Sequence, residues 1–278
     1  MPRPTLAGAV LLITAAVAGL AALFSDDAGA QSPTGQSLTG QSPTGLPAAL
    51  VFGILETEQP PLVDLRNGEV AGGLIKAIGD EIARRTGFKP LYRLVPRNRL
   101  EADLADGLID LACGYSPDWL PKVAITRFSP PILVSHSVLV VRRADSERLR
   151  TLGDLAGRPI GAILGFRYPR EVEAAFIDGT WQREDAPSAE SNFLKLRNQR
   201  VDAILTTDLE ADYRQTVDKT WARALTVLPQ TVGDHEERCA NAPRSPLAME
   251  TLDAAIEAMR ADGTLTRLRL AATGRAAS

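Results

Sequence analysis

The chain has 278 residues, of which 45% are hydrophobic and 23% charged, and this excludes a disordered tail or a mini-protein and suggests one or two packed domains. Its 31 basic and 34 acidic side chains give a net charge of −3, so no global positive field is available for binding nucleic acid or an anionic membrane surface. Two cysteines and two histidines cannot supply a four-ligand Cys/His metal site without carboxylates. We therefore expect no metal centre and no cofactor.

Residues 1–30 have the features of an export signal. Arg3 precedes an uncharged stretch over residues 6–24, and Ala28-Gly29-Ala30 supplies the small residues of a signal-peptidase site. We expect a signal peptide over residues 1–30 and a periplasmic mature protein. Because the apolar stretch is nearly long enough to span a bilayer, an uncleaved membrane anchor is the competing interpretation.

A repetitive segment follows the predicted signal. Residues 31–45 read QSPTG-QSLTG-QSPTG, without an aromatic or a charged side chain. Such a segment has nothing to bury, and we expect a disordered spacer over residues 31–46.

Beyond the spacer, short apolar runs alternate with helical periods, which is typical of α/β folds with parallel sheets. The runs predict strands over residues 49–55, 91–95, 109–113, 137–141, 160–164, 203–206 and 225–228.

Three helices and one short turn of helix are indicated between these runs. Residues 73–86 place apolar side chains four apart and end at Gly87, a residue suited to a helix C-terminus. Residues 99–106 form a shorter helix, and Ser245-Pro246 predicts the start of a helix that ends near Gly263. Thr151 is expected to cap a short helix that has Asp154 in its first turn.

Six motifs in order resemble one protein family. They are Glu58-Gln-Pro-Pro61, Gly72-Gly73, Gly107-Leu-Ile-Asp110, Phe128-Ser-Pro-Pro131, Leu152-Gly-Asp-Leu-Ala-Gly157 and Ala261-Asp-Gly-Thr264. From about Val51 to Leu270 the chain resembles the extracellular solute-binding proteins of family 3, the polar-amino-acid receptors of bacterial ABC importers.

The resemblance implies a two-lobe α/β fold of the periplasmic-binding-protein type II, each lobe a mostly parallel sheet flanked by helices. It places lobe 1 at residues 47–135 plus 230–278 and lobe 2 at residues 136–229. The implied function is capture of a small polar or anionic ligand between the lobes for an ABC permease in the inner membrane, with the protein acting as a monomer and without nucleic acid.

In lobe 1 the resemblance points to three pocket positions. In the family an arginine binds the ligand carboxylate, and Lys122 occupies the corresponding position in this sequence. The alternative is that Lys122 is an exposed surface lysine. Trp119 stands where the family has a threonine, and its side chain either forms the floor of the ligand pocket or packs in the core of the lobe. Arg97 replaces a ligand-facing aromatic residue, and a solvated surface charge is the alternative.

In lobe 2 the family's Gly-Ser-Thr turn is replaced by Gly165-Phe166-Arg167, so both hydroxyls are lost. The ammonium-binding aspartate corresponds to Thr207, with Asp208 one place later, and Asp208 either turns into the pocket or caps a helix. With Glu58 as a further candidate acid, cations exceed anions at these positions. The excess predicts an acidic amino acid, a dicarboxylate or a similar small anion as the ligand.

The resemblance also bears on the two cysteines. Cys113 ends a predicted strand, and Cys239 lies in the segment that returns into lobe 1 beside it. In an oxidising compartment such neighbours form a disulfide, and two buried free thiols are the alternative.

Two other functions are compatible with this fold. No catalytic triad or GxSxG motif is evident, so we do not expect an enzyme, but periplasmic cyclohexadienyl dehydratases resemble the same family. A ligand-sensing or partner-binding module without transport is the other alternative, and a retained membrane anchor would favour it.

Overall fold

The computed structural model describes residues 47–117 and 127–274. The predicted signal peptide and spacer lie outside these residues, as do Trp119 and Lys122. None of the helices in the described ranges is both long and apolar enough to cross a bilayer.

The strands are β1 (Ala49–Leu55), β2 (Asp64–Arg66), β3 (Glu69–Gly72), β4 (Lys89–Val95), β5 (Leu111–Tyr115), β6 (Arg127–Phe128), β7 (Leu133–Arg142), β8 (Pro159–Ile163), β9 (Gln182–Ala186), β10 (Ala203–Thr207) and β11 (Leu225–Asn241). The α-helices are α1 (Leu74–Thr86), α2 (Leu100–Ala105), α3 (Arg170–Ile177), α4 (Ala189–Arg197), α5 (Asp208–Val217), α6 (Lys219–Ala224), α7 (Met249–Ala261) and α8 (Thr264–Ala272).

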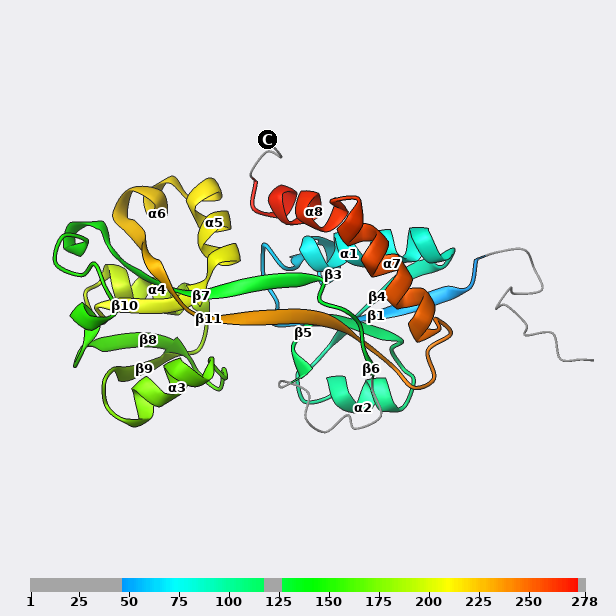
Figure 1. Cartoon of the computed structure of the whole chain (residues 1–278), viewed down its shortest axis with the longest axis horizontal. Coiled ribbons are helices and arrows are strands. Elements are labelled where there is room, and N and C mark those ends of the chain that lie inside the picture. The colour runs from blue at the N-terminus through cyan, green and yellow to red at the C-terminus, as the bar shows by residue number, and fades with distance from the viewer. Residues whose placement is uncertain (1–46, 118–126, 275–278) are drawn as a thin grey trace, which may run out of the picture. The chain divides into compact units, whose positions relative to one another are not determined.

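The predicted two-lobe α/β fold is confirmed (Figure 1). In lobe 1, β4, β1 and β5 are parallel neighbours, and in lobe 2, β10, β8 and β9 are parallel neighbours. The antiparallel strands β7 and β11 join the two sets, because β11 pairs with β7 over its first part and with β5 at its end. The predicted lobe boundaries at residues 135 and 230 fall within these two connecting strands.

Alternating side chains build a core on each face of the lobe 1 sheet. Leu50, Phe52 and Ile54 of β1 pack with α1 and α7 on one face, whereas Val51 and Leu55 pack with α2 on the other. Lobe 2 repeats the plan, since successive residues of β7 enter two separate clusters, one with α3 and one with α4 and α6. Each sheet is therefore covered by helices on both faces.

The predicted helix over residues 73–86 is present from Leu74 and ends at Gly87. Gly73 precedes it with φ of +100°, and a side chain at this position would collide with the Leu62 carbonyl. Only glycine fits at this entry to the helix.

Three local predictions differ in detail from the structure. The helix predicted from Ser245 begins at Met249, because the Ser245 hydroxyl accepts the amide of Leu247 and forms a turn first. Thr151 does not cap the 3-10 helix Gly153–Leu155; instead the Asp154 carboxylate accepts the Thr151 amide and hydroxyl. The strand predicted over residues 225–228 is the beginning of the 17-residue β11.

Candidate functional site

A cavity of about 500 Å³, called here the cleft cavity, is lined by residues of both lobes. Lobe 1 contributes Glu58, Leu62, Arg97, Glu101, Gly114, Tyr115 and Glu237, and lobe 2 contributes Ile163, Leu164, Gly165, Phe166, Arg167 and Thr207. Most of these residues end a parallel strand or directly follow one. Ligands of open α/β sheets bind at this edge, outside the carboxyl ends of the strands.

Charged side chains of both signs gather around the cleft cavity. Arg97, Arg167 and Glu58 form no ion pair and no side-chain hydrogen bond with another residue in the described ranges. Most other arginines in those ranges are paired, as Arg142 is with Asp145 and Asp202. Unpaired charges of both signs around one cavity are groups that a ligand could satisfy.

Two carboxyl groups in the cleft cavity hold their protons more tightly than usual. Burial raises the pKa of Glu58, and the nearby Arg97 guanidinium partly opposes this effect. Burial also raises the pKa of Glu237 to about 7, although a hydrogen bond from Ser135 at 2.8 Å favours its charged form. Its second oxygen, Oε2, is buried and has no hydrogen-bond partner in the part of the chain that the structure describes.

Five of the predicted site residues therefore line one cavity: Glu58, Arg97, Phe166, Arg167 and Thr207. The Thr207 hydroxyl also accepts the Glu210 amide and caps α5, so it has a structural role as well. Lys122 and Trp119 lie outside the described residues.

Asp208 is engaged elsewhere. Its Oδ2 accepts a hydrogen bond from Arg269 of α8 at 2.6 Å, and its Oδ1 accepts the His136 amide. It is not among the described residues that line the cleft cavity, and Thr207 rather than Asp208 caps α5. In this arrangement Asp208 links α5 of lobe 2 to α8 of lobe 1.

Glu101, Tyr115 and Glu237 were missed by the sequence analysis. A signal for Glu237 was available, because it lies two residues before Cys239 in a strand and therefore on the same face. Tyr115 is also two residues from a cysteine, but the pairing of β5 with β11 shifts register at Gly114, and Tyr115 packs with Ala112 in the core on the other face of the sheet. The position of Glu237 was therefore predictable from strand alternation, whereas that of Tyr115 was not.

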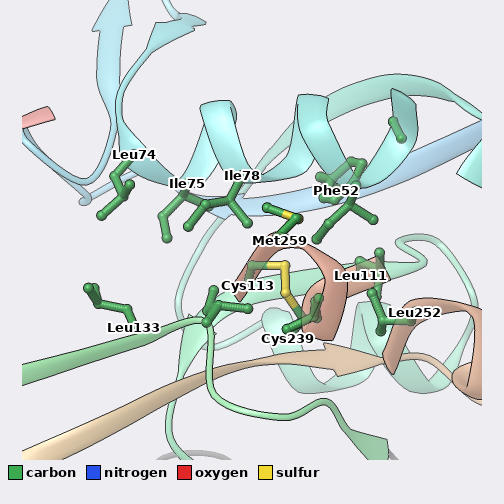
Figure 2. Packing of buried hydrophobic residues seen from close by; sticks show 14 of the residues in the cluster. Phe52, Leu74, Ile75, Ile78, Leu111, Cys113, Leu133, Cys239, Leu252 and Met259 are labelled. Carbon is green, nitrogen blue, oxygen red and sulfur yellow. A yellow bond between two sulfur atoms is a disulfide. The ribbon is translucent and has the colours of Figure 1, made fainter. Parts of the chain in front are cut away.

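The predicted disulfide is present between Cys113 of β5 and Cys239 of β11. The two residues are direct partners in the antiparallel register, and both are buried in the lobe 1 core (Figure 2). The bond fixes the end of β11 to lobe 1.

A second cavity, of about 950 Å³, shares Arg167 with the cleft cavity. Two of its three carboxylates are already paired, Glu236 with Arg238 and Asp234 with His136. Because these carboxylates are paired, the cleft cavity is the better candidate for ligand binding.

Nowhere in the described ranges do three or more metal-ligating side chains form a group that could hold an ion.

The fold and this cavity between lobes define a two-lobe binding protein. The model of the bacterial extracellular solute-binding proteins, family 3, matches residues 50–271, and the chain belongs to this family. No curated protein matches the chain by sequence.

Solved structures share the fold. An amino acid ABC transporter substrate-binding protein, AbpA from Streptococcus pneumoniae, bound to L-arginine, has 19% identity and a TM-score of 0.62, covering 82% of this chain and 95% of that one. The ancestral amino acid-binding protein AncCDT-1, a precursor of cyclohexadienyl dehydratase, has 18% identity and a TM-score of 0.63, with 81% and 95% covered. The GluR0 ligand binding core with L-glutamate has 14% identity and a TM-score of 0.66, with 83% and 100% covered. At these identities the likeness concerns the fold alone.

Proposed function

We propose that the protein is an exported receptor that captures a small zwitterionic ligand of the amino-acid class in the cleft cavity and delivers it to an ABC permease. The observation that carries this proposal is the set of charged side chains of both signs around the cavity, of which Arg97, Arg167 and Glu58 form no ion pair within the described ranges. The guanidinium groups of Arg97 and Arg167 suit a carboxylate, because they can donate two parallel hydrogen bonds. Glu58 and Glu237 suit an ammonium group.

This proposal replaces the expected anionic ligand with a zwitterion. The described charged residues of the cleft cavity are two arginines and three glutamates, so the cation excess expected from sequence is not found among them. A ligand that brings one positive and one negative group would satisfy both kinds of side chain.

Export supports the same proposal. The predicted signal peptide over residues 1–30 would carry the protein to the periplasm, and the Cys113–Cys239 disulfide suits an oxidising compartment. AncCDT-1 is described as an amino acid-binding protein, and AbpA as an amino acid ABC transporter substrate-binding protein bound to L-arginine.

Titration calorimetry with the twenty amino acids and C4 dicarboxylates tests the proposal. We expect Arg97→Met to weaken binding of the best ligand by about 100-fold, because it removes a charge-assisted contact. The matched control is Arg66→Met, an exposed arginine outside the cavity that should change the affinity less than about twofold. Absence of binding by every amino acid would refute the proposal, whether or not a dicarboxylate binds.

Glu237 favours a second candidate, a dehydratase. A carboxyl group with a pKa of about 7 facing a cavity with two arginines could act as a general acid. Incubation with prephenate or arogenate should then give an aromatic product whose formation is lost in Glu237→Gln. Failure of the native protein to form this product would eliminate the candidate.

A further inference from the structure

The cleft cavity has two walls of different chemistry. The lobe 1 wall carries four charged side chains, Glu58, Arg97, Glu101 and Glu237. The lobe 2 wall is formed largely by the apolar residues that end β8 and follow it, Ile163, Leu164 and Phe166, next to one charge at Arg167. A ligand that satisfies both walls has a charged end and an apolar end.

The apolar residues of the lobe 2 wall are accessible. Leu164 is 66% exposed and Phe166 is 37% exposed, although both are large apolar side chains. Phe166 packs against Tyr168, with ring centroids 4.9 Å apart, so its ring is held at the cavity. Exposed apolar side chains inside a concave, partly charged cavity are typical of a ligand site, because the ligand removes them from water.

A smaller space, called here the inner cavity, adjoins this wall. It has a volume of about 100 Å³ and shares Ile163, Phe166 and Thr207 with the cleft cavity. Apolar side chains form most of its lining, including those of Ala189, Phe193, Ile204 and Leu205. An apolar cavity of about 150 Å³ holds benzene, so about 100 Å³ suits a branched aliphatic group.

Several polar side chains of the inner cavity already have partners. Ser137 is hydrogen-bonded to His235 at 2.8 Å. The Thr206 hydroxyl donates to Glu210 at 2.8 Å, and Arg214 lies 3.6 Å from the same carboxylate. The side-chain amide of Asn192 is buried there without a hydrogen-bond partner among the described residues, so the cavity offers one uncharged polar contact. A charged ligand side chain would still lose its hydration without gaining a free counter-charge.

We propose, building on the function above, that the ligand is an α-amino acid with an apolar side chain, such as leucine, isoleucine, valine or phenylalanine. Its ammonium and carboxylate groups face the charged wall and Arg167. Its side chain packs on Leu164 and Phe166 and extends toward the inner cavity.

The test compares ligands that share one head group. Calorimetry with leucine, phenylalanine, alanine, glutamine and arginine should give the tightest binding for leucine or phenylalanine. Leucine should bind at least tenfold more tightly than alanine, equivalent to about 1.4 kcal/mol. If arginine or glutamine binds more tightly than every apolar amino acid, this inference is overturned while the proposed function stands; if no amino acid binds, both are overturned.

Two variants locate the apolar subsite. Leu164→Gln alters an exposed residue, so it should fold normally and should weaken leucine binding about tenfold while changing alanine binding less than about twofold. Ala189→Leu, which adds carbon atoms beside the inner cavity, should also weaken leucine more than alanine. The matched control is Ile177→Gln, a lobe 2 residue that is 84% exposed and lines neither cavity, and it should leave both affinities unchanged. Equal leucine affinities in the native protein and Leu164→Gln would refute the proposal that the ligand side chain packs on Leu164.

Discussion

Replacement of Glu237 by glutamine is expected to remove a pH dependence that this buried carboxyl group imposes on the stability of the protein. Glu237 is 5% exposed, and burial raises its pKa from an ordinary 4.5 to about 7, with a further increase from the Glu58 carboxylate nearby. Ser135 and Arg269 act in the opposite direction. The folded protein therefore binds this proton more tightly than the unfolded chain does.

The sign and the size of the effect follow from proton linkage. Below pH 4.5 both states hold the proton, and the contribution of Glu237 to stability is fully present. Between pH 4.5 and about 7 the unfolded chain has lost this proton while the folded protein still holds it, so rising pH favours the unfolded chain and the free energy of unfolding falls until the folded state also ionises. Each pKa unit is equivalent to about 1.4 kcal/mol, so a rise from 4.5 to about 7 corresponds to a loss of about 3 kcal/mol.

Urea unfolding at several pH values between 4.5 and 8 measures this loss. The free energy of unfolding should fall more steeply with pH in the native protein than in Glu237→Gln, which keeps the shape of the side chain but cannot ionise. Glu236→Gln is the matched control, because Glu236 is the exposed neighbour in the same strand. If the native protein and Glu237→Gln show the same slope, the assignment of a raised pKa to Glu237 is wrong.

Two further predictions concern stability. Cys113→Ala with Cys239→Ala should lower the free energy of unfolding by about 5 kcal/mol, since the disulfide joins residues 126 apart in sequence; a decrease below 1 kcal/mol in urea unfolding would contradict the loop-entropy reasoning. Arg269→Met and Asp208→Asn should show a coupling free energy of about 1 kcal/mol in a double-mutant cycle, because their ion pair at 2.6 Å is partly shielded from water, and additive effects would show that the contact adds no stability.

Apolar periodicity predicted those elements that bury one face. The helix at residues 73–86 and most of the strands appear because each places a continuous apolar stripe against a core. By contrast, the edge strand Gln182–Ala186 reads QREDA and has a single buried residue, Ala186. It contains no apolar run from which a strand could be predicted. Its strand conformation comes from pairing with β8, a tertiary contact that the local sequence does not contain.

The candidate site was only partly predictable for a related reason. Positions that directly follow strands, such as Arg97 and Arg167, could be placed by their spacing from family motifs. The partner of Asp208 could not, because Arg269 lies 61 residues away in sequence and meets it only where α8 of lobe 1 and α5 of lobe 2 approach each other in the folded protein. Glu237 was overlooked because the polar segment Asp-His-Glu-Glu at residues 234–237 resembles a solvated surface, although strand alternation with Cys239 indicated that every second side chain is buried.

β11 joins these features mechanically. Cys239 is bonded to β5, so Glu237, two residues earlier on the same face, is held with the charged wall of lobe 1. The pairing of β11 with β7 shifts register between Val227 and Asp234, before the disulfide is reached. We expect any change in the angle between the lobes to be accommodated in that irregular stretch, because strands bend at register irregularities. Such a change would move the apolar wall of lobe 2 relative to the charged wall of lobe 1, whose own geometry would stay the same. Mutations in one wall should therefore affect binding of the charged groups of the ligand, and mutations in the other wall binding of its apolar side chain.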